Sequence, residues 1–136
     1  MKAKILVSII ILLFASILLV ACEKKYPSRN ELPKIKDLIG KLQREVDARN
    51  AAAIDSLIIA EAYDEGYSSA SILEAVYNTD TAAFFAFANK EITYEHNKGE
   101  VLFNIVADSS DTTGRPAEMT IVKIADDWFI KRFDLK

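Results

Sequence analysis

MTIVKIADDWFIKRF, residues 119–133, contains the pattern that decides the fold. Apolar residues recur at every second position, Met119 and Ile121 before and Trp128 and Ile130 after a short segment, Ala125-Asp126-Asp127. A period of two is typical of β-strands, and a connection this short joins only antiparallel neighbours. The segment therefore predicts a hairpin of two strands, Ala117–Ile124 and Trp128–Leu135.

The same period continues towards the N-terminus. It predicts two further strands, Glu91–His96 and Glu100–Asp108, joined by the turn Asn97-Lys98-Gly99. A polar loop, Ser109–Pro116, connects them to the hairpin. The result is an antiparallel meander of three to four or more strands.

Both faces of this meander carry apolar residues. One face holds Val101, Phe103, Ile105, Met119, Ile121, Trp128 and Ile130, and the other holds Leu102, Val106, Val122, Ile124, Phe129 and Phe133. A sheet that is apolar on both sides needs two covers. We therefore expect either a sheet that curls around an internal pocket or a second copy packed on it.

Helices are predicted ahead of the sheet. The first is amphipathic, because Ile35, Leu38, Ile39, Leu42 and Val46 recur at steps of three and four residues. A second helical stretch is predicted over Ala51–Ala62, and a third, with a capping box of Ser71 and Glu74, ends at Tyr77. The segment Thr81–Ala88 fits a turn of helix or a first strand equally well.

These elements predict the α+β class, with two or three N-terminal helices packed on a curved antiparallel sheet. The predicted domain comprises residues 31–136, which is long enough to bury a core of its own. Tyr63, Tyr67 and Tyr77 in the helical region either line a pocket or cap the core with their hydroxyls in water.

The N-terminal segment has a different composition. Lys2 and Lys4 precede an almost unbroken apolar run, Ile5–Ala21, which is typical of an export signal. A run of this length is also about the minimum that can cross a bilayer, so an uncleaved anchor is the alternative. The only cysteine of the chain, Cys22, ends the run and is followed by Glu23-Lys24-Lys25. It has no partner for an intramolecular disulfide.

The end of this run, Leu19-Val20-Ala21-Cys22, resembles the lipobox of bacterial lipoproteins. The resemblance implies cleavage before Cys22 and thioether attachment of diacylglycerol to its sulfur, usually with acylation of the new amino terminus. Residues 1–21 are then a signal peptide and residues 22–30 a lipidated tether. At about 3.3 Å per residue, the tether holds the domain at most about 25 Å from the lipid surface.

The expected location is the bacterial cell envelope, with the membrane as a partner through the lipid on Cys22. Glu23, rather than aspartate, after the cysteine favours the outer over the inner membrane in bacteria with both. Without Lys2 and Lys4 the chain has 15 basic and 20 acidic residues, a charge of −5. This charge argues against nucleic acid as a partner.

The domain itself resembles the nuclear transport factor 2-like, cystatin-like superfold, and in particular small lipoproteins of unknown function that carry such a domain. The resemblance rests on the helices-then-sheet order and on the lysine-containing strand pair of residues 119–123 and 127–131. It implies a cone with a pocket at its mouth and, in many members, dimerisation through the sheet. The superfold hosts isomerases and cyclases as well as binding modules, so it does not decide function.

Acid–base chemistry has three candidate residues. His96 and Tyr94 alternate on one strand and share a face, and Asp108 ends the next strand. A histidine or carboxylate near a phenol in an apolar pocket is suited to proton transfer. The alternative is that His96 lies exposed at a strand end and that Asp108 opens a loop.

No metal-ligand spacing, activated nucleophile or glycine-rich phosphate loop is visible, and no cofactor is expected. The first hypothesis is a non-catalytic lipoprotein that binds a small apolar ligand or a protein, with a homodimer as a further option. The second is an isomerase- or cyclase-like enzyme using Tyr94, His96 and Asp108. The third is a periplasmic inhibitor or assembly factor.

Overall fold

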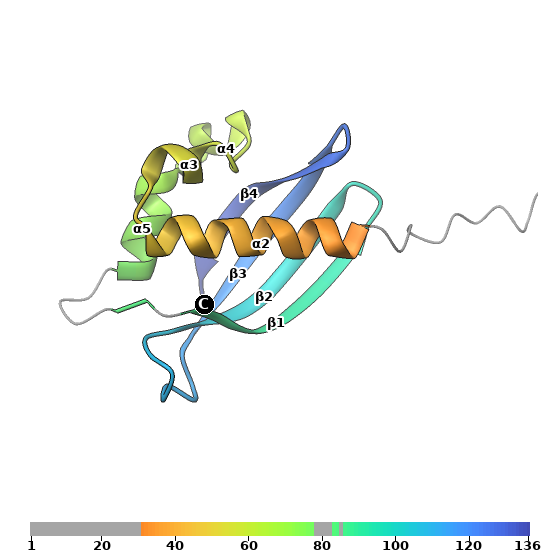
Figure 1. Ribbon diagram of the computed structural model, residues 1–136. Helices are drawn as coiled ribbons and strands as arrows, with labels where there is room; N and C mark the ends of the chain where they lie inside the picture. The colour runs from red at the N-terminus through yellow and green to blue at the C-terminus, as the bar shows by residue number, and fades with distance from the viewer. Residues whose placement is uncertain (1–30, 78–82, 85) are drawn as a thin grey trace, which may run out of the picture.

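A four-stranded antiparallel sheet with helices on one face forms the domain (Figure 1). The computed structural model describes residues 31–77, 83–84 and 86–136. The helices are α2 (Glu31–Asp47), α3 (Ala51–Asp55), α4 (Ala60–Asp64) and α5 (Ser69–Tyr77), and the strands are β1 (Ala86–Glu95), β2 (Lys98–Val106), β3 (Arg115–Ile124) and β4 (Asp127–Leu135). The predicted α+β class and the antiparallel meander, in the order β1-β2-β3-β4, are confirmed.

Some predictions fall outside the described residues. These include the signal, the lipobox and the tether, which lie in residues 1–30, and part of the ambiguous segment, residues 81, 82 and 85. The end of that segment belongs to a strand, because β1 begins at Ala86.

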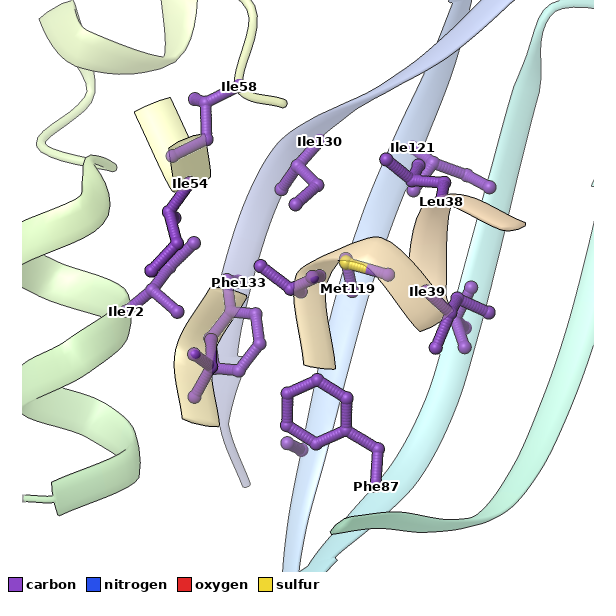
Figure 2. Packing of buried hydrophobic residues seen from close by; sticks show 14 of the residues in the cluster. Leu38, Ile39, Ile54, Ile58, Ile72, Phe87, Met119, Ile121, Ile130 and Phe133 are labelled. Atoms are coloured by element: carbon purple, nitrogen blue, oxygen red, sulfur yellow. The ribbon is translucent and has the colours of Figure 1, made fainter. Parts of the chain in front are cut away.

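Helix α2 forms as its apolar stripe predicts. Ile35, Leu38, Ile39, Leu42 and Val46 are all buried, whereas the lysines and Asp37 between them are exposed. The helix lies across the sheet, and its stripe meets the inward side chains of the strands (Figures 1 and 2). Burial of such side chains supplies most of the stability of an amphipathic helix.

The predicted second helix is interrupted. Residues 56–59 leave the helical path between α3 and α4, and Ile58 forms a parallel bridge with Ile130 of β4. The N–H of Ile59 donates to the carbonyl of Ile130 at 3.0 Å, and the N–H of Ile130 donates to the carbonyl of Leu57 at 2.8 Å. Pairing with the strand edge therefore replaces the helical bonds, and helical periodicity does not reveal this competition.

The cap of α5 differs from the prediction. The N–H of Ser68 donates to Oγ of Ser71 at 2.8 Å, and the N–H of Ser71 donates to Oγ of Ser68 at 3.4 Å. The reciprocal pair is thus Ser68 with Ser71, not Ser71 with Glu74, because a serine hydroxyl takes the accepting role that Glu usually fills.

The predicted core face of the sheet is confirmed, since all seven of its residues are at most 5% exposed. The prediction that Phe133 lies on the other face is wrong. Ile121 pairs with Ile130 and Thr120 with Arg132, so Lys131 is an extra residue in β4. This bulge reverses the alternation and turns Phe133 into the core, where its ring lies 5.7 Å from that of Phe103.

The opposite face has no helix over it in the described chain. Leu102, Val122 and Phe129 are half-buried there, and Ile124 is 52% exposed. Val106 is the buried exception, because it lies against Gly114 of the β2–β3 loop. The sheet is open, so this face is presented outward rather than folded around an interior pocket.

Candidate functional site

The first residue of α2 is fixed to the β3–β4 hairpin. Oε2 of Glu31 accepts a hydrogen bond from Nε1 of Trp128 at 2.6 Å, and Oε1 accepts one from Nζ of Lys123 at 2.7 Å. Glu31 is buried, with 8% of its surface exposed. We call these three residues the Glu31 clamp.

The clamp is built for an ionised carboxylate. The hydrogen bond from Lys123, followed by that from Trp128, holds the pKa of Glu31 below its usual value, against the opposing effect of burial. Lys34 reinforces the same junction, because its Nζ donates to the carbonyl of Asp126 at 3.1 Å. The start of α2 and the tip of the β3–β4 hairpin therefore form one rigid end of the domain.

Two grooves run along the two sides of α2. The α2–β4 groove has a volume of about 470 Å³ and is lined by Pro33, Lys34, Asp37, Leu38, Lys41, Leu57, Asp127, Trp128 and Phe129. Its charges are balanced, and Lys41 forms an ion pair with Asp37 at 2.8 Å. An apolar floor with a rim of equal positive and negative charges suits a neutral or zwitterionic ligand.

The α2–β1 groove, on the other side, has a volume of about 500 Å³. It is lined by Lys36, Ile39, Gly40, Gln43, Lys90 and Ile92. The four residues from α2 occupy positions i, i+3, i+4 and i+7, so they form one stripe of the helix. Among the described residues of this lining, the two lysines are the only charged ones.

Gly40 lies in the middle of α2, where glycine is less favourable than alanine by about 0.5–1 kcal/mol. A Cβ at this position would meet only Nη1 of Arg44, at 3.8 Å, which is an ordinary contact. The packing of the domain therefore does not require glycine here. A glycine within an amphipathic helix can be seen in the sequence, but the periodicity does not indicate that Lys90 and Ile92 lie in the same groove as Gly40.

The three predicted acid–base residues do not converge. Tyr94 lies half-buried on the helix side of β1, with its ring 6.3 Å from that of Trp128 in an edge-on arrangement. His96 leaves the strand with a φ of +54°, and its side chain is 86% exposed beside Glu95. Asp108 follows the other end of β2, roughly 26 Å away along the strand. The expected shared face of Tyr94 and His96 is lost because His96 belongs to the turn.

Asp108 shapes its own loop. Its Oδ1 accepts hydrogen bonds from the backbone N–H of Ser110 at 2.8 Å, from the hydroxyl of Ser110 at 2.6 Å and from the N–H of Asp111 at 3.1 Å. These bonds, chiefly those from Ser110, lower the pKa of Asp108. An ionised carboxylate held by a turn is suited to structure rather than to proton transfer at neutral pH.

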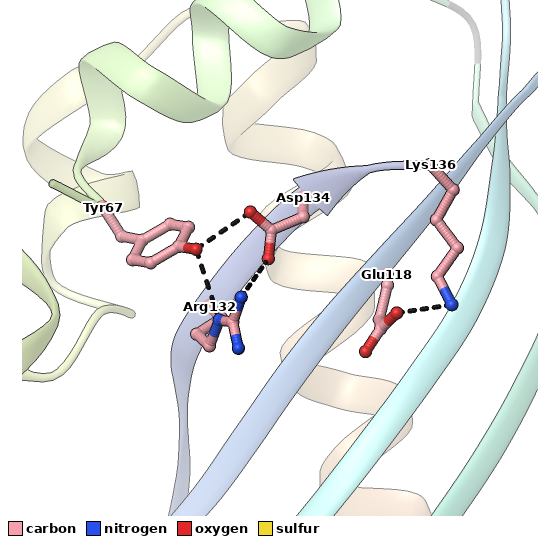
Figure 3. A network of polar contacts seen from close by, with 5 residues as sticks. All are labelled: Tyr67, Glu118, Arg132, Asp134 and Lys136. Atoms are coloured by element: carbon pink, nitrogen blue, oxygen red, sulfur yellow. Dashed lines mark hydrogen bonds and ion pairs between the residues drawn. The ribbon is translucent and has the colours of Figure 1, made fainter. Parts of the chain in front are cut away.

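A polar network lies on the open face of the sheet (Figure 3). The hydroxyl of Tyr67 donates to Asp134 at 2.9 Å and accepts from Nε of Arg132 at 3.2 Å. Beside it, Lys136 pairs with Glu118 at 2.5 Å. Tyr63 and Tyr77 also donate to protein, to the carbonyls of Asp55 and Val46, so all three tyrosine hydroxyls are bonded within the domain.

Glu100 also belongs to this network, and its pKa is shifted in the opposite direction to that of Glu118. Its hydrogen bond with Glu118 and the negative charge of that neighbour raise the pKa of Glu100. The hydrogen bond from Lys136 lowers the pKa of Glu118, so Glu118 holds the negative charge of the pair. The pair lies at the surface, and Glu100 also lines an open hollow of about 430 Å³ together with residues of β1 and the start of β2.

Within residues 31–77, 83–84 and 86–136, no group of three or more His, Cys, Asp or Glu side chains is placed to hold a metal ion. No helix of this part of the chain is long and apolar enough to cross a bilayer. No protein-family model and no curated protein matches this sequence.

Proposed function

We propose that the chain is a lipoprotein of the bacterial envelope whose domain binds a ligand without catalysing a reaction. The observation that carries the proposal is the sequence Leu19-Val20-Ala21-Cys22, with the only cysteine of the chain directly behind an export signal. Two or three acyl chains at Cys22 would make membrane attachment effectively permanent.

The Glu31 clamp supports a tethered arrangement. α2 begins nine residues after Cys22, and the clamp fixes its first residue to the β3–β4 hairpin. The eight residues between Cys22 and Glu31 keep the start of α2 within about 25 Å of the lipid surface. The end of the domain that carries the clamp would then be the end nearest the membrane.

Binding rather than catalysis is supported by the separation of Tyr94, His96 and Asp108. The grooves beside α2, at about 470 and 500 Å³, are in the range of small-ligand sites, about 300–1,000 Å³. A helix across one face of a bulged antiparallel sheet is compatible with a nuclear transport factor 2-like domain. We propose that fold family on this arrangement and on the resemblance of residues 119–131.

Metabolic labelling with an alkynyl fatty acid tests the lipid anchor. The native chain is expected to take up the label and to sediment with envelopes, preferentially with the outer membrane of a bacterium that has two. Cys22→Ser removes the only thiol and should abolish the label. It should also block cleavage, so the precursor accumulates.

A matched control moves the thiol. The double variant Cys22→Ser/Ser28→Cys keeps one cysteine in the segment but not at the lipobox position. It should stay unlabelled. Label on Cys22→Ser or on the double variant, or cleavage that is indifferent to Cys22, would refute the lipoprotein assignment.

Pairing of two copies through the open face of the sheet is the second candidate, and it would serve the protein-binding alternative. It is favoured by the exposed Ile124 beside half-buried Val122 and Phe129. Sedimentation equilibrium should then detect a dimer that Val122→Glu dissociates. A monomer at every concentration would exclude this pairing.

A further inference from the structure

We propose that the α2–β1 groove binds a fatty carboxylate: its acyl chain lies against Ile39, Gly40 and Ile92, and its carboxylate pairs with Lys36 and Lys90. This inference rests on the ligand-binding function proposed above and names the ligand class. It is carried by four observations on the groove: its charge, its glycine, its hydrogen bonds and its distance from the start of α2.

The charge of the groove is the opposite of the charge of the chain. The sequence has a net charge of −3, yet both charged residues of this lining are lysines. In the described part of the chain, neither ammonium group has a carboxylate within 4.0 Å, whereas Lys41 of the α2–β4 groove is paired with Asp37. An anion would therefore find two uncompensated cations here.

Gly40 leaves space where a side chain would project into the groove. Every other residue except proline would favour the helix more, and the nearest heavy atom to a Cβ is 3.8 Å away. The absence of a side chain thus has no packing role in the domain, but it keeps the groove open beside Ile92, which is half-buried. A flexible acyl chain needs such a slot.

One hydrogen bond joins α2 to β1 beside the groove, and a second lies within β1. Oε1 of Gln43 accepts the N–H of Phe87 at 2.9 Å, which ties α2 to the strand. Nζ of Lys90 donates to the carbonyl of Phe87 at 3.1 Å, next to a bulge in which Asn89 has a φ of +51°. The bond to Phe87 restricts the exposed Lys90 side chain next to the bulge, and such a restriction lowers the entropic cost of binding.

The tether supplies the argument for an acyl ligand. Lys36 lies five residues into α2, about 8 Å along the helix axis from Glu31. Glu31 itself is nine residues from Cys22. The groove would therefore operate next to a bilayer, where fatty acids are released from lipids and dissolve poorly in water.

Photo-crosslinking in isolated envelopes that contain the full chain tests the proposal. The probe is dodecanoic acid that carries a diazirine and an alkyne, and the counter-probe is the matching dodecyl trimethylammonium compound. The carboxylate probe should label peptides that contain residues 36–43 or 90–92, and the cationic probe should label them at least fivefold less. Equal labelling by both probes, or labelling confined to the α2–β4 groove, would overturn the proposal.

Variants separate specific binding from partition into the membrane. Lys36→Glu/Lys90→Glu should lower labelling at least fivefold, while the charge-matched control Lys98→Glu/Lys131→Glu should not change it. Gly40→Leu, which fills the slot, should abolish labelling without reducing resistance to limited proteolysis. Undiminished labelling in either groove variant would contradict the assignment.

The same envelopes distinguish the two proposals. If the chain is absent from them, or if its retention does not depend on Cys22, the lipoprotein assignment fails. If the chain is retained through Cys22 but its groove is not labelled, only the fatty-carboxylate site fails.

Discussion

The two faces of the sheet are made from the same four strands but differ in how deeply their side chains are buried. On the helix face, Val101, Met119 and Ile121 are fully buried under α2. On the open face, Glu118 and Arg132 alternate with the half-buried side chains of Leu102 and Val122. Adjacent residues of one strand therefore contribute very differently to stability, because only one of each pair loses its contact with water.

The comparison also separates two uses of carboxylates. At the start of α2, two hydrogen-bond donors lower the pKa of Glu31 and so stabilise its ionised form. On the open face, the hydrogen bond and the negative charge of Glu118 raise the pKa of Glu100 and so oppose its ionisation. Loss of one partner of the polar contacts on the helix side should therefore destabilise the domain more than loss of a partner on the open face.

The largest expected effect is on the helix face. Ile121→Ala should destabilise the domain by about 2–5 kcal/mol, because it leaves a cavity beneath α2. Its neighbour on the open face, Val122→Ala, should cost less than about 1 kcal/mol. Urea unfolding of both variants measures the difference, and equal losses would show that the open face is covered in solution.

The next effect concerns the Glu31 clamp. Folding lowers the pKa of Glu31, so its stabilisation is complete above the ordinary value of 4.5 and disappears as the pH falls through the lower folded value. Glu31→Gln should therefore reduce the melting temperature more at pH 7 than at pH 3. The exposed Glu61→Gln is the control. A Glu31→Gln deficit that persists unchanged at pH 3 would exclude the charged clamp.

Gly40→Ala should act in the opposite direction. It should stabilise the domain by about 0.5–1 kcal/mol, because alanine favours a helix and its methyl group meets no obstacle. Thermal unfolding of the apo protein measures this gain. A loss of stability instead would mean that glycine is required for packing, and the argument for an open slot would then fall.

The smallest effect is expected at Glu100. Its pKa is raised on folding, so its ionised form opposes the folded state, and this opposition appears as the pH rises through the folded pKa. Glu100→Gln should raise the melting temperature slightly at pH 7 and leave it unchanged at pH 3. A decrease at pH 7 would mean that the pair with Glu118 is stabilising.

The sequence predicted the parts of the fold that depend on periodicity. The stripe of α2 and the alternation of β2 and β3 each repeat over several residues, so local order reveals them. Prediction from the sequence failed where a single contact between distant residues determines the local structure. The bulge at Lys131 and the bridge between Ile58 and Ile130 both arise from pairing in β4, which no local pattern encodes.

The grooves were hidden for the same reason. Their linings combine residues of α2 with residues more than forty positions away, such as Lys36 with Lys90 or Leu38 with Trp128. The acid–base hypothesis joined Tyr94, His96 and Asp108 through strand alternation alone. The structure does not bring these residues together, because a left-handed turn residue and a loop residue do not continue that alternation.

The intact mass of the mature protein, extracted from envelopes and measured by mass spectrometry, tests the central claim most directly. The account predicts a chain that begins at residue 22 and carries the added mass of a diacylglycerol, with or without a further acyl group. A mass that retains the first 21 residues, or that matches an unmodified chain beginning elsewhere, would contradict it.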